Sequence, residues 1–255
     1  MNQYQAQDLG LTHIPVMIPE VLSYLAIIPV GIYLDGTICP GGHATPFVKE
    51  LLDCGKIIWI YGEDEALDIC LLNLKTSSSI LSLYHNSYNN LDKILAAEGL
   101  SAFNGVLLDL GLSSLQLGSK NRGFSYRSEG SLDMRYDQSS GSGAGKLINK
   151  TDQDSLAQIF KEYGEERLAS RIAKSIKEMT AMNTIADLRE AIRRCTPPNH
   201  RDRTFARIFQ ALRITVNGEL DILQQFLTKF IDFLRPGGRI PVSYTHLTLP
   251  TKRIV

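Results

Sequence analysis

The chain has 255 residues, of which 44% are hydrophobic and 21% charged, and its 27 basic side chains balance its 27 acidic ones. These values are typical of a globular protein and exclude collagen, a coiled coil and wholesale disorder. A neutral chain has no overall field that attracts nucleic acid or membrane, so such binding would need a local patch.

The sequence predicts no targeting segment and no disulfide or metal pattern among its cysteines. The apolar run from Val21 to Val30 is too short to span a bilayer. The first residues contain no basic segment followed by an apolar one, so no secretory signal is expected. The four cysteines form no CxxC pair and show no metal-ligand spacing. We therefore expect a reduced, cytoplasmic protein without a metal and without a membrane partner.

The first half of the chain alternates short β-rich segments with helical ones. A helix is predicted around Val21 and Leu25, and helical spacing recurs over residues 47–52. Strands are predicted at residues 31–35, 56–61, 79–85 and 105–110. This alternation predicts βαβ units and hence an α/β protein with a largely parallel sheet.

After residue 116 the pattern changes to helices without intervening strands. Apolar residues recur at helical spacing from Leu156 to Met179 as a single stripe. Thr184 and Asp187 resemble a capping box that opens a helix ending at Pro197. A last amphipathic helix, over residues 220–231, is predicted to end at the Pro-Gly-Gly of residues 236–238, and a strand is predicted from Arg239. The helical block therefore looks inserted into one nucleotide-fold domain.

Three segments end or follow strands of the predicted sheet. Asp35 is followed by a loop with Gly41, Gly42 and His43, where the backbone can approach an adenosine-type cofactor, although a plain strand-to-helix turn is the alternative. The loop lacks GxGxxG, which disfavours a nicotinamide enzyme. Tyr61 occupies the second strand end, where an acid would bind ribose hydroxyls.

The fourth strand ends near Asp109, which either faces the cofactor crevice or caps the next turn. The acidic run that begins at Glu63 either replaces the missing ribose acid or is a solvated helix start.

Five motifs occur in a fixed order along the chain. They are LDGTxxxGGH, LLDLGLSSxQL, RGFSYRxxGxLDMRxD, YGEERxAxRIAxxI and FQALRIxVNxEL. Together they resemble the RsmH/MraW-type methyltransferases, which methylate the exocyclic amine of a cytidine in 16S ribosomal RNA. The resemblance implies a class I Rossmann-like methyltransferase sheet with an inserted all-helical domain, and S-adenosylmethionine as cofactor.

The resemblance also assigns site residues. It implies that the cofactor is bound by seven residues, of which Tyr61 stands where the family has Asp: Gly41, Gly42, His43, Tyr61, Tyr88, Asp109 and Gln116. Asp109, or a nearby carbonyl, is the candidate acceptor for the amine proton. The implied partner is 16S ribosomal RNA in the small ribosomal subunit, with no DNA partner. The target base must leave its stack to reach the methyl group. Phe124 and Tyr126 either stack on this extruded base or pack locally.

RNA binding by a neutral chain requires a local group of cations. Seven arginines lie between residues 189 and 213, against two acidic residues. A solvated helix face with internal ion pairs is the alternative explanation, but arginine at this density favours phosphate contact. The candidate RNA-binding residues are Arg122, Arg135, Arg201, Arg203 and Arg207.

The match to the family pattern stops after Ile240. The remaining residues resemble a translated sequencing adaptor, so we expect residues 241–255 to be a non-native tail, with the last strands of the sheet missing. The expected domains are residues 1–116 with 205–240 for methyl transfer and residues 117–204 for the helical insertion. A catalytically impaired fragment or homologue that binds RNA or ribosomal particles is the alternative function.

Overall fold

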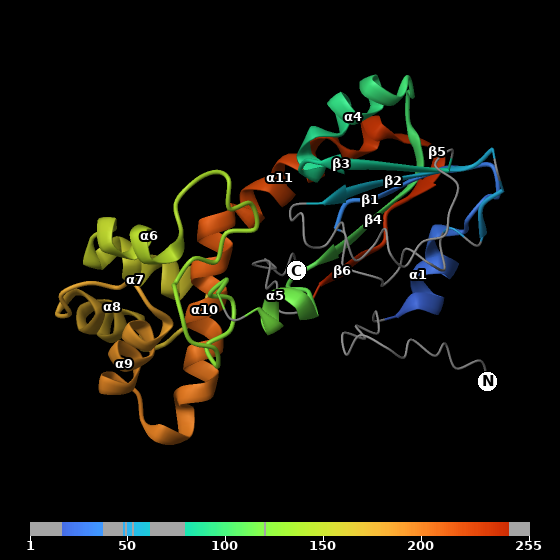
Figure 1. The fold of residues 1–255 in the computed structure, drawn as a ribbon. Coiled ribbons are helices and arrows are strands. Elements are labelled where there is room, and N and C mark those ends of the chain that lie inside the picture. The colour runs from blue at the N-terminus through green and yellow to red at the C-terminus, as the bar shows by residue number, and fades with distance from the viewer. Residues whose placement is uncertain are drawn as a thin grey trace, which may run out of the picture. The chain divides into compact units, whose positions relative to one another are not determined.

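The computed structural model describes residues 17–37, 48, 50–52, 54–61, 80–119 and 121–244. The chain divides into two compact units, one made of residues 1–115 and 222–255 and the other of residues 116–221. Figure 1 shows the strands of the first unit and the helices of the second. The boundary expected at residue 204 falls inside a helix, and the division places that whole helix in the second unit.

The first unit contains a parallel sheet of six strands in the order β3-β2-β1-β4-β5, with β6 also paired to β4 (Figure 1). The α/β class predicted from the alternating pattern is confirmed. The strands are β1 (Ile32–Asp35), β2 (Lys56–Tyr61), β3 (Leu81–His85), β4 (Phe103–Leu110), β5 (Leu234–Arg239) and β6 (Val242–Tyr244). The first four lie where the sequence predicts strands.

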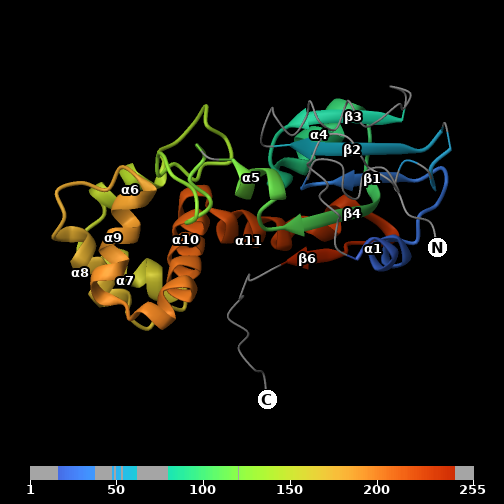
Figure 2. The same ribbon diagram turned by 60° about the horizontal axis from the view of Figure 1, so that its bottom comes forward.

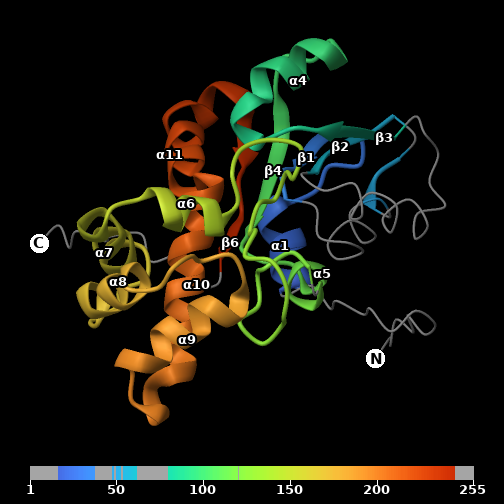
Figure 3. The same ribbon diagram turned by 60° about the vertical axis from the view of Figure 1, so that its left-hand side comes forward.

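The central strands β1, β2 and β4 are buried on both faces, as expected of parallel strands. Alternate strand residues, among them Tyr33 and Trp59, pack against α1 (Ile18–Leu25). The residues between them, such as Leu34 and Ile58, pack against α4 (Leu91–Glu98) and α11 (Glu219–Lys229). Figure 3 shows α4 and α11 on the same side of the strands. The short 3-10 helix η1 (Tyr88–Asn90) precedes α4.

The last strands differ from the sequence prediction. Helix α11 ends at Lys229 and is followed by the 3-10 helix η3 (Phe230–Phe233), and β5 starts at Leu234 rather than at Arg239. Phe103 pairs with Leu234 and Gly105 with Arg239, so the Pro-Gly-Gly segment is accommodated as an irregularity within the strand pair rather than as a turn before it. Residues 242–244, which belong to the segment predicted to be a non-native tail, form β6.

The second unit is all-helical in its described residues, apart from the isolated bridge between Ser131 and Thr184. Figure 2 shows its helices gathered beside the long α10. The unit begins within α5 (Ser114–Gly118), at residue 116. Its further elements are α6 (Ala144–Lys150), α7 (Gln153–Glu162), α8 (Ala169–Lys177), α9 (Ile185–Cys195), η2 (Pro198–His200) and α10 (Arg201–Asn217).

Two local signals in this unit have different outcomes. The capping box is confirmed, because Thr184 accepts from the Asp187 N–H and the Asp187 carboxylate accepts from the Thr184 N–H. The apolar stripe predicted as continuous is divided between two separate helices, α7 and α8. A Cβ on Gly164, between them, would lie 2.7 Å from the Arg207 carbonyl oxygen, so a glycine permits this close approach to α10.

Candidate active site

Polar and aromatic side chains lie at the carboxyl ends of four neighbouring strands. Asp35, Tyr61 and His85 end β1, β2 and β3, and Asp109 is the penultimate residue of β4. Because the strands are parallel, these ends share one edge of the sheet. The strand order reverses between β1 and β4, and open α/β sheets bind ligands at such a switch point.

A chain of hydrogen bonds crosses this switch point. Asp35 is only 4% exposed, and its Oδ1 accepts from the Thr37 N–H at 3.1 Å. The Thr37 Oγ1 in turn accepts from the Asp109 N–H at 2.5 Å. Thr37 therefore joins the segment that leaves β1 to the tip of β4.

The Asp109 side chain is held by the neighbouring strand. Asp109 pairs with Ser243 in the register of β4 and β6, and the Ser243 hydroxyl donates to Asp109 Oδ1 at 2.6 Å. A hydrogen bond from a hydroxyl restricts the orientation of a carboxylate, which accepts through both of its oxygens. The sheet thus fixes both the backbone and the carboxylate of this residue.

Gly36 lets the chain pass close to β4 on leaving β1. Its N–H donates to the Leu107 carbonyl at 2.9 Å. A Cβ at this position would lie 2.7 Å from Leu108 Cδ2 and 3.1 Å from the Tyr88 Cβ. Since real Cβ atoms do not approach so closely, a side chain here would force the switch point open. Tyr88 consequently lies beside the start of the loop predicted to bind the cofactor.

Aromatic contacts organise the same edge of the sheet. The rings of Tyr61 and His85 stack with centroids 5.2 Å apart and an angle of 19°. The Tyr88 ring meets Phe226 of α11 edge to face, with centroids 5.6 Å apart. Tyr61 thus offers a phenol hydroxyl at this strand end, where the resemblance predicts a carboxylate.

Several predicted site residues are not brought together by the described structure. Gly41, Gly42 and His43 lie outside the described residues, so their convergence with Asp109 stays a prediction. Gln116 lies in α5 and is the first residue of the second unit. Neither placement changes the arrangement of Asp35, Thr37 and Asp109.

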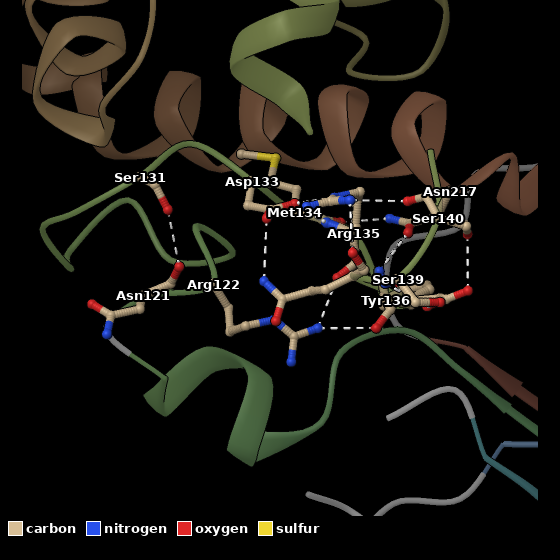
Figure 4. A network of polar contacts seen from close by, with 12 residues as sticks. Asn121, Arg122, Ser131, Asp133, Met134, Arg135, Tyr136, Ser139, Ser140 and Asn217 are labelled. Atoms are coloured by element: carbon tan, nitrogen blue, oxygen red, sulfur yellow. Dashed lines mark hydrogen bonds and ion pairs between the residues drawn. The ribbon is translucent and has the colours of Figure 1, made fainter. Parts of the chain in front are cut away.

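A second polar network shapes the loop over residues 121–143 in the helical unit. Figure 4 shows the Arg122 guanidinium directed at the backbone carbonyls of Arg135 and Tyr136, to which it donates at 2.7 and 3.0 Å. Arg135 forms a two-pronged pair with Asp133, with N–O distances of 2.7 and 2.9 Å. Burial alone would raise the pKa of Asp133, but hydrogen bonds from Arg135 and Gln138 lower it.

The same loop is tied to the end of α10. Met134 is fully buried and has a φ of 63°, a backbone conformation that is unfavourable for a residue other than glycine. Its carbonyl accepts from Asn217 Nδ2, and the Tyr136 N–H donates to Asn217 Oδ1, both at 2.8 Å (Figure 4). Arg213 and Glu219, both largely buried, form an ion pair at 2.8 Å, and the Tyr136 hydroxyl donates to Glu219. These contacts join the third of the five motifs, which contains Met134, to the fifth, which contains Asn217.

The predicted RNA-binding arginines fall into two groups. Arg122 and Arg135 make the contacts within the loop described above. On α10, Arg201 donates to the carbonyl oxygen of Thr196, Arg207 lies 3.8 Å from the Glu166 carboxylate, and Arg203 is exposed. Arg203 has no hydrogen-bond or ion-pair partner within the described residues. Phosphate contact by any of these arginines stays a prediction.

Sequence reasoning missed two residues that contact Asp109. Thr37 lies inside the first motif, and its spacing of two residues from a strand-end Asp is typical of an Asx turn, in which the carboxylate accepts from the N–H two residues on. Ser243 belongs to the segment regarded as foreign, and only the register of β6 against β4 reveals its contact.

None of the helices in the described part of the chain combines the length and apolar character needed to cross a bilayer. The same residues contain no group of three or more His, Cys, Asp or Glu side chains that could hold a metal ion.

Comparison with known proteins identifies clear relatives. The profile of the MraW methylase family matches residues 10–248. The chain is 43% identical over 240 residues to ribosomal RNA small subunit methyltransferase H of Thermotoga neapolitana, covering 92% of this chain and 80% of that protein. It is 40% identical to the proteins of the same name from Caldicellulosiruptor saccharolyticus and Halothermothrix orenii, covering 92% of this chain and 77% and 78% of theirs.

Proposed function

Because the chain belongs to the MraW methylase family, we propose that it transfers a methyl group from S-adenosylmethionine to the exocyclic amine of a cytidine in 16S ribosomal RNA. The observation that carries this proposal is the match of family and relatives over nearly the whole chain. The predicted methyltransferase class and Rossmann-like sheet are confirmed. The non-catalytic alternative is not favoured, since the relatives are named as methyltransferases.

The strand ends offer side chains that suit this cofactor. S-adenosylmethionine supplies a methyl group activated by attachment to a sulfonium. A carboxylate at the tip of β4 suits a cationic ligand, and the Tyr61 phenol and His85 imidazole can exchange hydrogen bonds with ribose hydroxyls. We assign cofactor binding to seven residues: Gly41, Gly42, His43, Tyr61, Tyr88, Asp109 and Gln116.

Asp109 is assigned the role of proton acceptor for the amine. The exocyclic nitrogen of cytosine is a poor nucleophile because its lone pair is delocalised into the ring, so positioning and hydrogen bonding carry the catalysis. A carboxylate has about four acceptor positions, so the bond from Ser243 is compatible with a second one from the amine. A hydrogen bond from the amine to Asp109 returns electron density to the nitrogen.

The substrate is proposed to be the RNA of the small ribosomal subunit in the cytoplasm. A base must leave its stack before its amine can reach a methyl donor in a crevice. Recognition of an assembled particle also explains why the chain as a whole has no net positive charge.

The proposal is tested by methyl transfer from labelled S-adenosylmethionine to purified small ribosomal subunits that lack the modification. Nucleoside mass spectrometry of the RNA should detect methylated cytidine. Asp109→Asn, which keeps the shape of the side chain, should lower the rate by about 10²–10⁴-fold. Asp92→Asn, at an exposed position of α4, is the matched control.

Two results would contradict the proposal. Label that never enters the RNA, although the chain binds the cofactor in a calorimeter, would refute the RNA methyl transfer. Transfer by Asp109→Asn at the parent rate would remove Asp109 from the chemistry and leave the activity itself standing.

A further inference from the structure

The two aromatic residues of the loop over 121–143 have different environments. Phe124 is 4% exposed and stacks on Tyr136, with centroids 5.6 Å apart. Tyr126 is half-buried and stacks on Phe205 of α10 at 5.5 Å and 27°, with Phe209 edge-on at 6.0 Å. Phe124 is thus part of the packing, whereas Tyr126 is an aromatic side chain held rigidly by two buried rings and still partly accessible.

Arginine side chains lie over these rings. The Arg127 guanidinium carbon is 5.6 Å from the centroid of Tyr126, and that of Arg193, on α9, is 6.0 Å from the centroid of Phe205. Both arginines are exposed, and neither has a carboxylate partner within the described residues. Nearby, Arg189 donates to the Tyr126 carbonyl at 3.3 Å. We refer to Tyr126, Arg127, Arg193 and Phe205 as the Tyr126 surface.

One ion pair lies close to the Tyr126 surface, at Arg189, whose guanidinium also donates to the Tyr126 carbonyl. The carboxylate found beside it is that of Glu129, which is 89% exposed and lies 3.9 Å from Arg189. An exposed ion pair at this distance contributes little, so Glu129 does not neutralise Arg127 or Arg193. In a chain with no net charge, two arginines without carboxylate partners on aromatic rings form a local cationic site.

We propose that the Tyr126 surface binds single-stranded RNA, with an unpaired base stacked against Tyr126 or its covering guanidinium and with Arg127 and Arg193 on the flanking phosphates. The inference rests on the proposed function and names how the helical unit holds that substrate. Unstacked bases are recognised on aromatic rings and on guanidinium planes, and arginine matches phosphate with paired donors. A duplex keeps its base faces covered, and an acidic peptide has no flat ring to stack.

This surface is distinct from the arginines of α10 predicted from the sequence. Arg203 precedes Phe205 by two residues, and residues two apart on a helix do not face each other. Arg207 contacts Glu166 rather than the rings. We choose the Tyr126 surface because its arginines lie over aromatic rings, and not because of how many arginines it contains.

The test uses the full chain and a fluorescein-labelled single-stranded RNA of twelve nucleotides, with anisotropy measured over a range of salt concentrations. Tyr126→Leu should weaken binding by about fivefold or more, because the stacking of one base contributes about 1–3 kcal/mol. Tyr126→Phe should bind as the parent does. Arg127→Gln and Arg193→Gln should each reduce the slope of log affinity against log salt by about 0.7.

Arg171→Gln is the matched control, since Arg171 is an exposed arginine of α8 in the same unit and should not change the affinity. Thermal unfolding of every variant checks folding, and the two arginine variants decide the outcome if Tyr126→Leu fails to fold. The proposal would then be overturned if the affinity for RNA is equal at all salt concentrations for the parent, Tyr126→Phe, Arg127→Gln and Arg193→Gln. Tighter binding of the matching duplex, or displacement of the RNA by a polyglutamate peptide at equal concentration, would also overturn it.

Methyl transfer to small ribosomal subunits, run alongside, separates this inference from the proposed function. If the parent transfers methyl groups while the surface variants bind RNA as the parent does, the surface is refuted and the function stands. If the parent transfers none while the variants lose RNA affinity, the function is refuted and the surface stands.

Discussion

The two units hold their polar segments by different kinds of contact. In the sheet unit, strand register places Asp109, and two hydroxyls, those of Thr37 and Ser243, form hydrogen bonds with it. In the helical unit, guanidinium groups such as those of Arg122 and Arg213 bind carbonyls and a carboxylate in buried surroundings. The backbone of the sheet places the strand-end residues, so we expect the fold to tolerate substitution of their side chains. The loop of the helical unit depends instead on its own charged side chains.

The largest expected effect is the loss of stability on breaking the buried ion pair of the helical unit. Arg213→Met leaves Glu219 charged, buried and unpaired, which should lower the free energy of unfolding by about 3–5 kcal/mol. Urea denaturation followed by circular dichroism measures it. Arg194→Met, which breaks the exposed pair with Glu190, should change stability by at most about 1 kcal/mol. Similar losses for both variants would contradict the comparison.

Removing a hydroxyl from the sheet unit should have a smaller effect. Thr37→Val leaves the Asp109 N–H without its acceptor, which should destabilise the protein by about 1–3 kcal/mol and slow methyl transfer. Thr37→Ser retains the oxygen and should behave as the parent in both assays. If valine and serine variants transfer methyl groups equally fast, the hydrogen bond across the switch point does not position Asp109.

Substitution of Tyr61 tests whether the side chain at a strand end can be changed and whether it controls cofactor affinity. Tyr61→Asp adds a charged acceptor for the ribose hydroxyls, and a hydrogen bond to a charged group contributes about 1.5–3 kcal/mol. Cofactor affinity in a calorimetric titration should therefore rise about tenfold or more. Tyr61→Phe, which removes only the hydroxyl, should not bind more tightly than the parent. An aspartate variant with unchanged affinity would show that the residue at this strand end does not control binding.

The smallest expected effect is a dependence of stability on alkaline pH in the sheet unit. Burial, followed by the hydrogen bond to Glu98 at 2.7 Å and its charge, raises the pKa of Tyr84 to about 12. The unfolded state ionises near pH 10, so this stabilisation is complete below pH 10 and is lost between pH 10 and pH 12. Urea midpoints for the parent should fall across that range more steeply than those of Tyr84→Phe. Parallel curves for the two proteins would refute the assignment.

The sequence was sufficient for the elements whose pattern is local. Hydrophobic runs that fill a buried parallel sheet marked β2 at residues 56–61 without error, and the spacing of Thr184 and Asp187 located the start of α9. It failed where the structure depends on distant partners. The strand β5 passes through a Pro-Gly-Gly segment that locally favours a turn, because β4 accepts an irregular register there.

The candidate site shows the same division. Asp35, Tyr61 and Asp109 could be placed at strand ends because parallel strands share an edge. The contact of Ser243 with Asp109 and the different burial of Phe124 and Tyr126 could not be predicted, since they depend on a register and on helix packing that no single segment encodes. The guanidinium groups of Arg122 and Arg135 were assigned to phosphate by residue type alone, and their contacts with the loop became visible only in the structure.

The irregular segment of β5 also bears on self-association. This strand lies at one end of the described sheet, and Pro236 within it has no N–H to donate, while Gly237 has a φ of 81°. A strand interrupted in this way is a poor template for a strand from another copy. The Pro-Gly-Gly segment should therefore help the chain to stay dispersed at high concentration, a colloidal property that its contribution to the fold alone would not suggest.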